Sequence, residues 1–199
     1  ILGGVKRIAT ASSIIVPFMA ISYVSVSIVI ILLNWDKVPD ALSLIIRSAF
    51  NPQSALGGAL GFTVMKAIQS GVARGIFSNE SGLGSAPIAA AAAQTHEPVR
   101  QGLISMTGTF LDTIIVCSMT GIVLVLTGAW NNPELAGATA TNYAFSQGLG
   151  SSIGATIVTI GLLFFAFTTI LGWCYYGERC FVYLAGTRGI RLYRLLFIV

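Results

Sequence analysis

The sequence predicts an all-α protein that crosses a membrane several times. Three observations support this prediction: 55% of the 199 residues are hydrophobic, only 9% are charged, and the mean hydropathy is +0.84. An ordinary globular domain has about 25% charged residues, and so few charges do not cover the surface of a soluble fold. The composition therefore excludes a soluble enzyme, a nucleic-acid-binding domain and a disordered chain, and it indicates a lipid bilayer as the surroundings.

Crossing the bilayer takes about 20 mostly apolar residues, and several stretches meet this requirement. The expected spans are residues 12–33, 56–93, 102–127 and 151–176, with a further span starting near 192. Residues 36–49 alternate charged and apolar side chains at helical spacing, which predicts an amphipathic helix on the membrane surface or a short soluble cap. Residues 129–150 are expected to form a loop. Because the chain begins without Met and ends inside an apolar run, we expect an internal fragment of a longer protein.

Basic residues are distributed unevenly among the connections between these spans. Lys6 and Arg7 precede the first span, residues 129–150 contain no Lys or Arg, and four arginines follow the span at 151–176. Cytoplasmic connections carry the excess of Lys and Arg in membrane proteins. The pattern therefore predicts a multi-pass protein of the cell (plasma) membrane with both ends of the fragment in the cytoplasm.

The stretch at 56–93 is too long for one span, and it is rich in glycine and serine. Gly75, Asn79, Gly82 and Gly84 lie in its middle, where glycine penalises a continuous helix and asparagine favours a cap. We expect one half-helix at 56–74, an unwound stretch at 75–79 and a second half-helix at 80–93.

An unwound stretch at membrane depth is tolerated only where it is buried in protein, lines a cavity or binds a ligand. The carbonyl end of the first half-helix would attract a cation or an ammonium group, and the amide end of the second would attract a carboxylate. Interrupted helices of this kind form the binding sites of many transporters. Close helix packing through the glycines at 57–61 is the alternative for that part of the stretch.

Four charged residues lie within the expected spans: Lys66, Arg74, Glu80 and Asp112. Each costs about 2.5–3.5 kcal/mol at the middle of a membrane helix, so each should have a partner or face water. We expect Arg74 or Lys66 to pair with Glu80 or Asp112.

The motif GVARGIFSNESGLGSAPIAAAAAQTHEPVRQGLISMTGTFLDT, which ends at Thr113, resembles the alanine or glycine:cation symporter family, also called sodium:alanine symporters. The likeness continues through TTILGWCYYGE, which begins at Thr168, and it covers the whole chain. Membership in this branch of the amino-acid–polyamine–cation superfamily implies a LeuT-like fold with two inverted repeats of five helices. The fragment would hold about helices five to eight and the start of nine, with the sixth discontinuous and the first absent.

The resemblance also implies the function. We expect secondary active transport of a small neutral amino acid, alanine or glycine, by symport with Na⁺ or H⁺. No catalytic residue and no cofactor are expected, apart from Na⁺ as the coupling ion, and no nucleic acid.

The substrate site is expected on the interrupted span. We assign the backbone carbonyls of Gly75, Ile76 and Phe77 to the substrate ammonium group, and the Phe77 ring to an apolar wall beside a small side chain. Ordinary core packing is the alternative for Phe77. Asn79 is expected either to contact the substrate or to cap the second half-helix.

The cation site is expected on the span at 151–176. The resemblance implies that the hydroxyls of Thr168 and Thr169 and the carbonyl of Phe165 bind Na⁺, with residues absent from this fragment completing the site. Oxygen ligands suit such a hard cation. Thr169 and Trp173 are also assigned to the substrate pocket, because they lie one turn apart on one face. The alternatives are threonines that bond to their own helix and a tryptophan that anchors at the membrane interface.

Two other classes of function are weighed. An ion channel, or a non-transporting membrane subunit, could use residues 75–84 as a re-entrant segment. An intramembrane enzyme is disfavoured because the sequence shows no Ser/His pair and no HExxH spacing. Cys117, Cys174 and Cys180 are interpreted as small apolar packing residues.

Overall fold

The computed structural model describes residues 4–49, 58–80, 82–132, 134–135 and 137–198. The side chains of residues 4–6, 49, 58–67 and 70 lie outside this description. Within the described ranges the regular structure is entirely helical, without a strand. The predicted all-α class is therefore confirmed.

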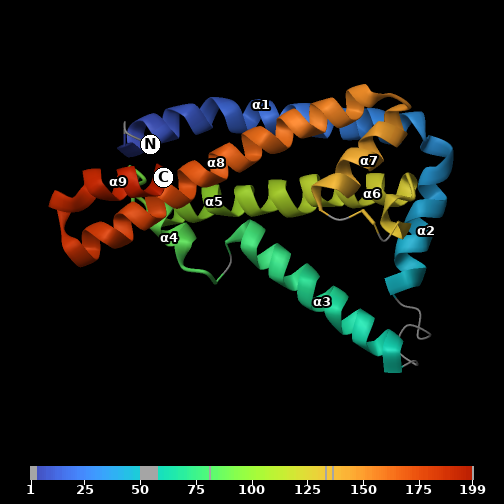
Figure 1. Ribbon diagram of the computed structural model, residues 1–199, viewed down its shortest axis with the longest axis horizontal. Coiled ribbons are helices and arrows are strands. Elements are labelled where there is room, and N and C mark those ends of the chain that lie inside the picture. The colour runs from blue at the N-terminus through green and yellow to red at the C-terminus, as the bar shows by residue number, and fades with distance from the viewer. Residues whose placement is uncertain (1–3, 50–57, 81, 133, 136, 199) are drawn as a thin grey trace.

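Three long helical stretches dominate the molecule (Figure 1). They are α1 (Gly4–Leu33), α8 (Ser152–Ala185) and a continuous run of α5 (Pro98–Thr109), the π-helix η3 (Phe110–Cys117) and α6 (Ser118–Leu126). Within the described residues, the stretches that are long and apolar enough to cross a membrane are Arg7–Leu33, Pro98–Leu126 and Ser152–Ala185. α1 and the α5–α6 run point in one direction and α8 returns, so both chain ends lie toward the same end of the molecule (Figure 1).

Shorter helices lie between and after these stretches. They are α2 (Val38–Ala49), α3 (Gly58–Asn79), α4 (Ser85–Ala90), α7 (Ala138–Leu149), α9 (Ile190–Ile198) and the 3₁₀ turns η1 (Trp35–Lys37), η4 (Ala129–Asn131) and η5 (Thr187–Gly189). The loop expected at 129–150 is wrong, because α7 occupies most of it. Its polar sequence conceals a helix that buries Ala144 and Phe145 on one side.

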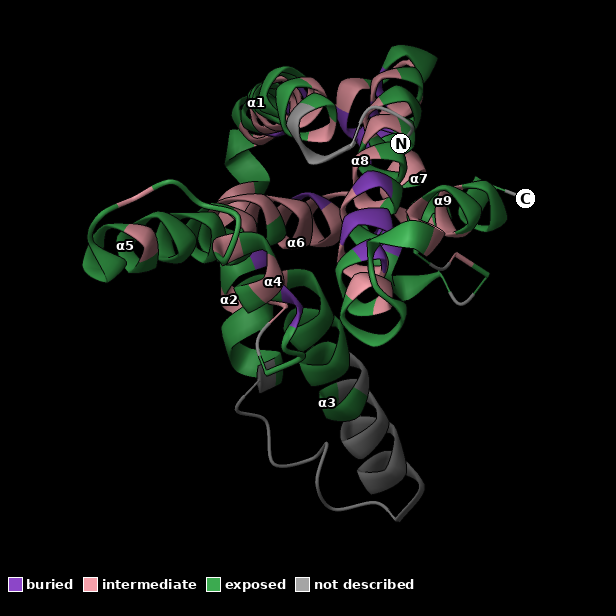
Figure 2. Ribbon diagram, turned by 90° about the vertical axis from the view of Figure 1, so that its left-hand side faces the viewer, coloured by how far each residue is buried: buried purple, intermediate pink, exposed green. Residues whose placement is uncertain are grey.

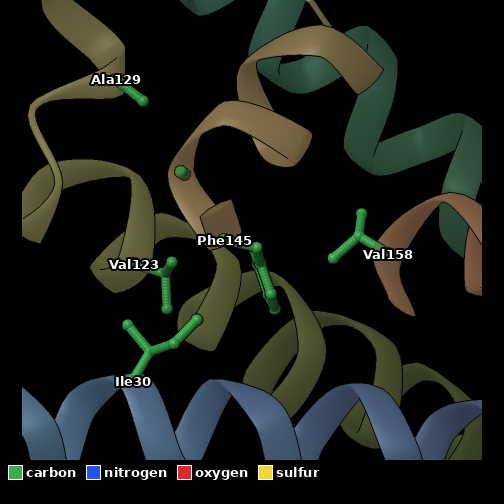
Figure 3. Packing of buried hydrophobic residues seen from close by; sticks show 6 residues of the cluster. Ile30, Val123, Ala129, Phe145 and Val158 are labelled. Carbon is green, nitrogen blue, oxygen red and sulfur yellow. The ribbon is translucent and has the colours of Figure 1, made fainter. Parts of the chain in front are cut away.

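The apolar core lies where α1, α6, α7 and α8 meet (Figure 3). It consists of residues that are at most 1% exposed: Ile30, Val123, Ala129, Ala144, Phe145 and Val158. The Tyr23 hydroxyl and the Thr120 hydroxyl lie 2.7 Å apart and link α1 to α6 beside this core. Away from the core most surfaces are exposed (Figure 2), and at most 17% of the most apolar window of each long helix is buried within the chain. Such helices suit a surrounding of lipid and neighbouring helices.

Candidate functional site

The interrupted span breaks later than the sequence predicts. α3 continues as a regular helix through Gly75 to Asn79, so the unwinding expected at residues 75–79 is wrong. Glu80 and residues 82–84 lie outside regular helix, and helical geometry resumes in α4. A single glycine costs a helix only about 1 kcal/mol, whereas Gly82 (φ 78°) and Gly84 (φ 79°) adopt the left-handed conformation that ends one.

Asn79 explains why the last turn of α3 stays closed. Its Nδ2 donates a 3.0 Å hydrogen bond to the Gly75 carbonyl. Asn79 thus completes α3. It does not cap the second half-helix, which is one of the two roles that the sequence predicts for it. The Glu80 amide donates to the Phe77 carbonyl at 3.4 Å, and the carbonyl end of α3 faces the break.

The second half-helix is much shorter than predicted. Residues 80–93 were expected to be helical, but α4 contains only six residues, Ser85–Ala90, less than two turns. Its few aligned peptides provide little dipole. The expected amide pole for a carboxylate therefore finds no support in this helix.

Glu80 connects the break to α8. Its carboxylate accepts hydrogen bonds from the Ser85 hydroxyl at 2.8 Å and from the Tyr176 hydroxyl at 3.1 and 3.2 Å. Its backbone is left-handed (φ 54°), and it is the one such non-glycine residue in the described part of the chain. A non-glycine residue in this conformation costs about 1–3 kcal/mol, which the hydrogen bonds of the side chain offset.

The end of α3 is also bound to the π-helix η3. The Ser78 hydroxyl donates to Asp112 Oδ2 at 2.5 Å. The next residue of each helix repeats the contact: Asn79 Nδ2 donates to Thr113 Oγ1 at 2.8 Å, and Thr113 Oγ1 donates to Asn79 Oδ1 at 3.0 Å. π-Helical turns are rare and frequently occur at functional sites, and here the turn carries both partners of α3.

The predicted ion pair of Arg74 is absent from the described contacts, and both acids accept hydrogen bonds from hydroxyl groups instead. Within the described side chains, the salt bridge is that between Arg194 and Glu178, and Arg74 forms none with Glu80 or Asp112. The Lys66 side chain lies outside the described residues. Hydroxyl donors stabilise the two acids because a hydrogen bond to a charged group contributes about 1.5–3 kcal/mol.

A cavity of about 300 Å³ lies between the break, α5, η3 and α8. It is lined by Ser78, Asn79, Glu80, Ala86, Ala89, Ala90, Gln101, Ser105, Gly108, Thr109, Asp112 and Tyr176. This lining contains two carboxylates and no basic side chain. Among the predicted site residues, only Asn79 lines it.

A second group of predicted residues meets beside the break. The rings of Phe77 on α3 and Trp173 on α8 are stacked, with centroids 5.9 Å apart and planes 13° from parallel. Tyr176 contacts Trp173 edge-on, at 5.9 Å and 74°. Phe77 is 51% and Trp173 39% exposed, so neither ring is enclosed by this chain.

The three predicted cation ligands also lie together. The hydroxyls of Thr168 and Thr169 both donate to the Phe165 carbonyl, at 3.0 and 2.9 Å. The bonding of these threonines back to their own helix, which the sequence left as the alternative, is thus present. It also gathers three oxygens on one turn of α8.

Four residues that form these contacts are not among the predicted site residues: Tyr176, Ser85, Ser78 and Thr113. Two signals could have found them. Tyr176 follows Trp173 by three residues and therefore shares its helical face. The adjacent polar pairs 78–79 and 112–113 lie in otherwise apolar helices, where polar side chains usually bond across helices.

These features define a multi-pass membrane protein with an interrupted helix packed against a π-helical turn. The sequence matches the Sodium:alanine symporter family over residues 1–199. The chain belongs to this family, which confirms the resemblance drawn from its motifs.

Relatives in other organisms support the same placement. The chain is 86% identical over 199 residues to an uncharacterized transporter of Haemophilus influenzae, covering 100% of this chain and 44% of the relative. It is 53% identical over 202 residues to the Sodium/alanine symporter AgcS of Methanococcus maripaludis, covering 100% and 43%. It is 42% identical over 178 residues to the Probable sodium/glutamine symporter GlnT of Bacillus subtilis, covering 89% and 36%. The chain thus spans less than half the length of these relatives.

Proposed function

We propose that the complete protein is a secondary transporter that carries a small neutral amino acid, alanine or glycine, together with Na⁺ or H⁺. The observation that carries this proposal is the family match along the whole chain. A relative that is 53% identical to this chain is named a sodium/alanine symporter, which points the same way. The helix break between α3 and α4 adds a physical reason, because interrupted helices supply backbone groups to transported solutes.

The proposed architecture is part of a LeuT-like inverted repeat in the plasma membrane. The chain would contribute helices five to eight and the start of nine, with α3 and α4 as the interrupted sixth. The shared direction of α1 and the α5–α6 run, and the opposite direction of α8, agree with this order (Figure 1). The arginines near the end of α8 and in α9 favour a cytoplasmic side for both chain ends under the positive-inside rule.

The substrate would lie where α3 ends. Its ammonium group would meet the carbonyl end of α3, from Ile76 onward, which attracts positive charge. Its side chain would rest against Phe77 and Trp173, whose stacked rings form an apolar surface suited to a small aliphatic group. Asn79, which binds Gly75 and Thr113, would hold this end of the helix in place.

The coupling cation would bind at Phe165, Thr168 and Thr169. Their oxygens already share one turn of α8, and each threonine hydroxyl retains acceptor capacity for a hard cation. Coupling follows if the same cation holds α8, and with it Trp173, against α3.

Uptake of radiolabelled alanine into vesicles that contain the full-length protein tests the proposal. We expect saturable uptake that an imposed Na⁺ or proton gradient accelerates. Equal rates at every gradient would refute the coupling, and currents without saturable uptake would favour a channel.

The threonines provide a separate test of the cation site. Thr168→Val and Thr169→Val each remove one oxygen at almost constant volume. If Na⁺ binds there, each should raise the Na⁺ concentration for half-maximal uptake about tenfold or more, since about 1.4 kcal/mol of binding corresponds to a factor of ten. Thr156→Val is the matched control, because that hydroxyl also bonds only to its own helix, at the Ser152 carbonyl.

A further inference from the structure

Three consecutive contacts join the helix break to the aromatic pair. The Glu80 carboxylate accepts the Tyr176 hydroxyl, the Tyr176 ring contacts the Trp173 ring edge-on, and Trp173 stacks on Phe77. Phe77 lies only three residues before Glu80. The contacts therefore form a closed loop that starts at Glu80 and returns to α3 one turn earlier, at Phe77.

We propose that Glu80 and Tyr176 are positioning residues that hold the Trp173 ring against Phe77 and so limit the size of the amino-acid side chain that the site accepts. Neither residue needs to touch the substrate. The inference rests on the proposed function, because it takes the Phe77–Trp173 surface as the wall of the amino-acid site.

The geometry at Glu80 fixes its carboxylate from two sides. Ser85 on α4 donates to Oε2 at 2.8 Å, and Tyr176 on α8 lies 3.2 Å from Oε1 and 3.1 Å from Oε2. A hydroxyl that is shared nearly equally by two carboxylate oxygens is held on the axis of that carboxylate. The phenol ring of Tyr176 therefore has little freedom to shift along α8.

The Trp173 ring needs such a support. Trp173 is 39% and Phe77 51% exposed, so enclosure by other side chains does not fix the angle between them. Aromatic pairs are attractive in both offset-stacked and edge-to-face arrangements, which leaves the indole more than one favourable position. The edge contact from Tyr176 favours the position in which the indole is stacked on Phe77.

Tyr176→Phe is the most specific variant, because it removes the hydroxyl and keeps the ring. Tyr23→Phe is its matched control: it removes a tyrosine hydroxyl that also bridges two helices, at 2.7 Å from Thr120, away from the aromatic pair. The assay compares uptake of alanine and of 2-aminobutyrate, which is one methylene larger, by the full-length protein.

We expect Tyr176→Phe to lower the preference for alanine over 2-aminobutyrate about tenfold, because one methylene accounts for roughly 10- to 200-fold discrimination in a tight apolar pocket. The change should appear in KM, with the maximal rate for alanine altered less than twofold. Glu80→Ala should give the same change, and the double variant should add nothing to it. Glu80→Gln retains an acceptor oxygen and should therefore keep most of the preference for alanine over 2-aminobutyrate. Tyr23→Phe should leave it unaltered.

A second measurement follows the Trp173 ring directly. In full-length protein labelled with 5-fluorotryptophan, the ¹⁹F resonance that disappears in Trp173→Phe belongs to this ring. It should shift in Tyr176→Phe and in Glu80→Ala, and it should remain in place in Tyr23→Phe. This reading does not depend on transport.

The outcomes separate the two proposals. A wild-type protein that takes up no neutral amino acid would overturn the proposed function, while the ¹⁹F resonance would still decide whether Glu80 and Tyr176 position Trp173. Normal uptake with unaltered selectivity in Tyr176→Phe, or an equal loss in Tyr23→Phe, would overturn the size-limiting role. An unshifted resonance in both site variants would overturn the positioning itself.

Discussion

The core between α1, α6, α7 and α8 and the break between α3 and α4 are held together by different kinds of contact. In the core, Phe145, Ile30 and Val123 are fully buried and interlock (Figure 3). At the break, exposed and half-buried side chains and the buried Ser85 meet through hydrogen bonds such as those of Glu80. Close packing resists any change of volume, whereas hydrogen bonds between exposed side chains can be exchanged for bonds to a ligand or water without leaving a void. The core is therefore suited to act as a scaffold and the break to rearrange around a ligand.

Truncating the core should have the largest effect on stability. Phe145→Ala removes a fully buried ring that contacts Tyr23 at 5.1 Å between centroids. The expected loss is about 3–5 kcal/mol of unfolding free energy, measured by thermal unfolding of the full-length protein in detergent. Phe77→Ala is the matched control at the break, and it should cost far less because that ring is half exposed. Equal losses would erase the distinction between the two regions.

Breaking the buried ion pair between α8 and α9 should have the second-largest effect on stability. Glu178, 7% exposed, accepts hydrogen bonds from Arg194 Nε at 2.6 Å and Nη2 at 3.0 Å, which fastens α9 to α8. Glu178→Ala leaves the guanidinium without this carboxylate and should cost about 3 kcal/mol. The measurement is the same thermal unfolding. The double variant Glu178→Leu/Arg194→Leu should recover much of the loss, and a double variant as unstable as the single one would contradict this account.

A substitution at the close backbone contact between α7 and α8 should have a smaller effect on stability. A Cβ on Gly154 would collide with the backbone carbonyl of Phe145 and would lie 3.1 Å from Leu149 Cδ1. Because backbone atoms cannot move aside as a flexible side chain does, Gly154→Ala should cost about 2 kcal/mol. A shift of the unfolding midpoint measures it. An unaltered midpoint would mean that α7 and α8 do not pack this closely in the membrane.

The sequence predicts these two regions unequally, for physical reasons. The apolar lengths of α1, α5–α6 and α8 follow from the thickness of the bilayer, and the motif around Gly75 identifies the family. The position of the break does not follow from glycine content, because it depends on which polar side chain closes the last turn, and Asn79 does so through Gly75.

The sequence also does not predict which residues far apart along the chain contact each other. Lys66 and Arg74 suggest ion pairs with Glu80 or Asp112 when charge alone is considered. The described contacts of these acids are instead with Ser85, Tyr176 and Ser78, and the Tyr176 contact joins residues 96 positions apart. Hydroxyls are too common in a sequence to be matched with acids without knowledge of how the helices pack. The short helix α7 was hidden for a related reason, since only its packing reveals which face is apolar.

Gly75→Ala should have the smallest effect, and it tests where the interrupted helix bends. Gly75 is helical, and a Cβ there would meet no atom within 4 Å. Alanine should therefore stabilise α3 by about 0.5–1 kcal/mol and leave alanine uptake within twofold. Gly82→Ala is the matched control at the observed break: it also meets no atom, but its φ of 78° is unfavourable for alanine, so stability should fall. If Gly75→Ala instead abolished uptake while the folded protein remained as stable as expected, residues 75–79 would have to leave helical geometry during the transport cycle, and the bend would not be confined to the connection between α3 and α4.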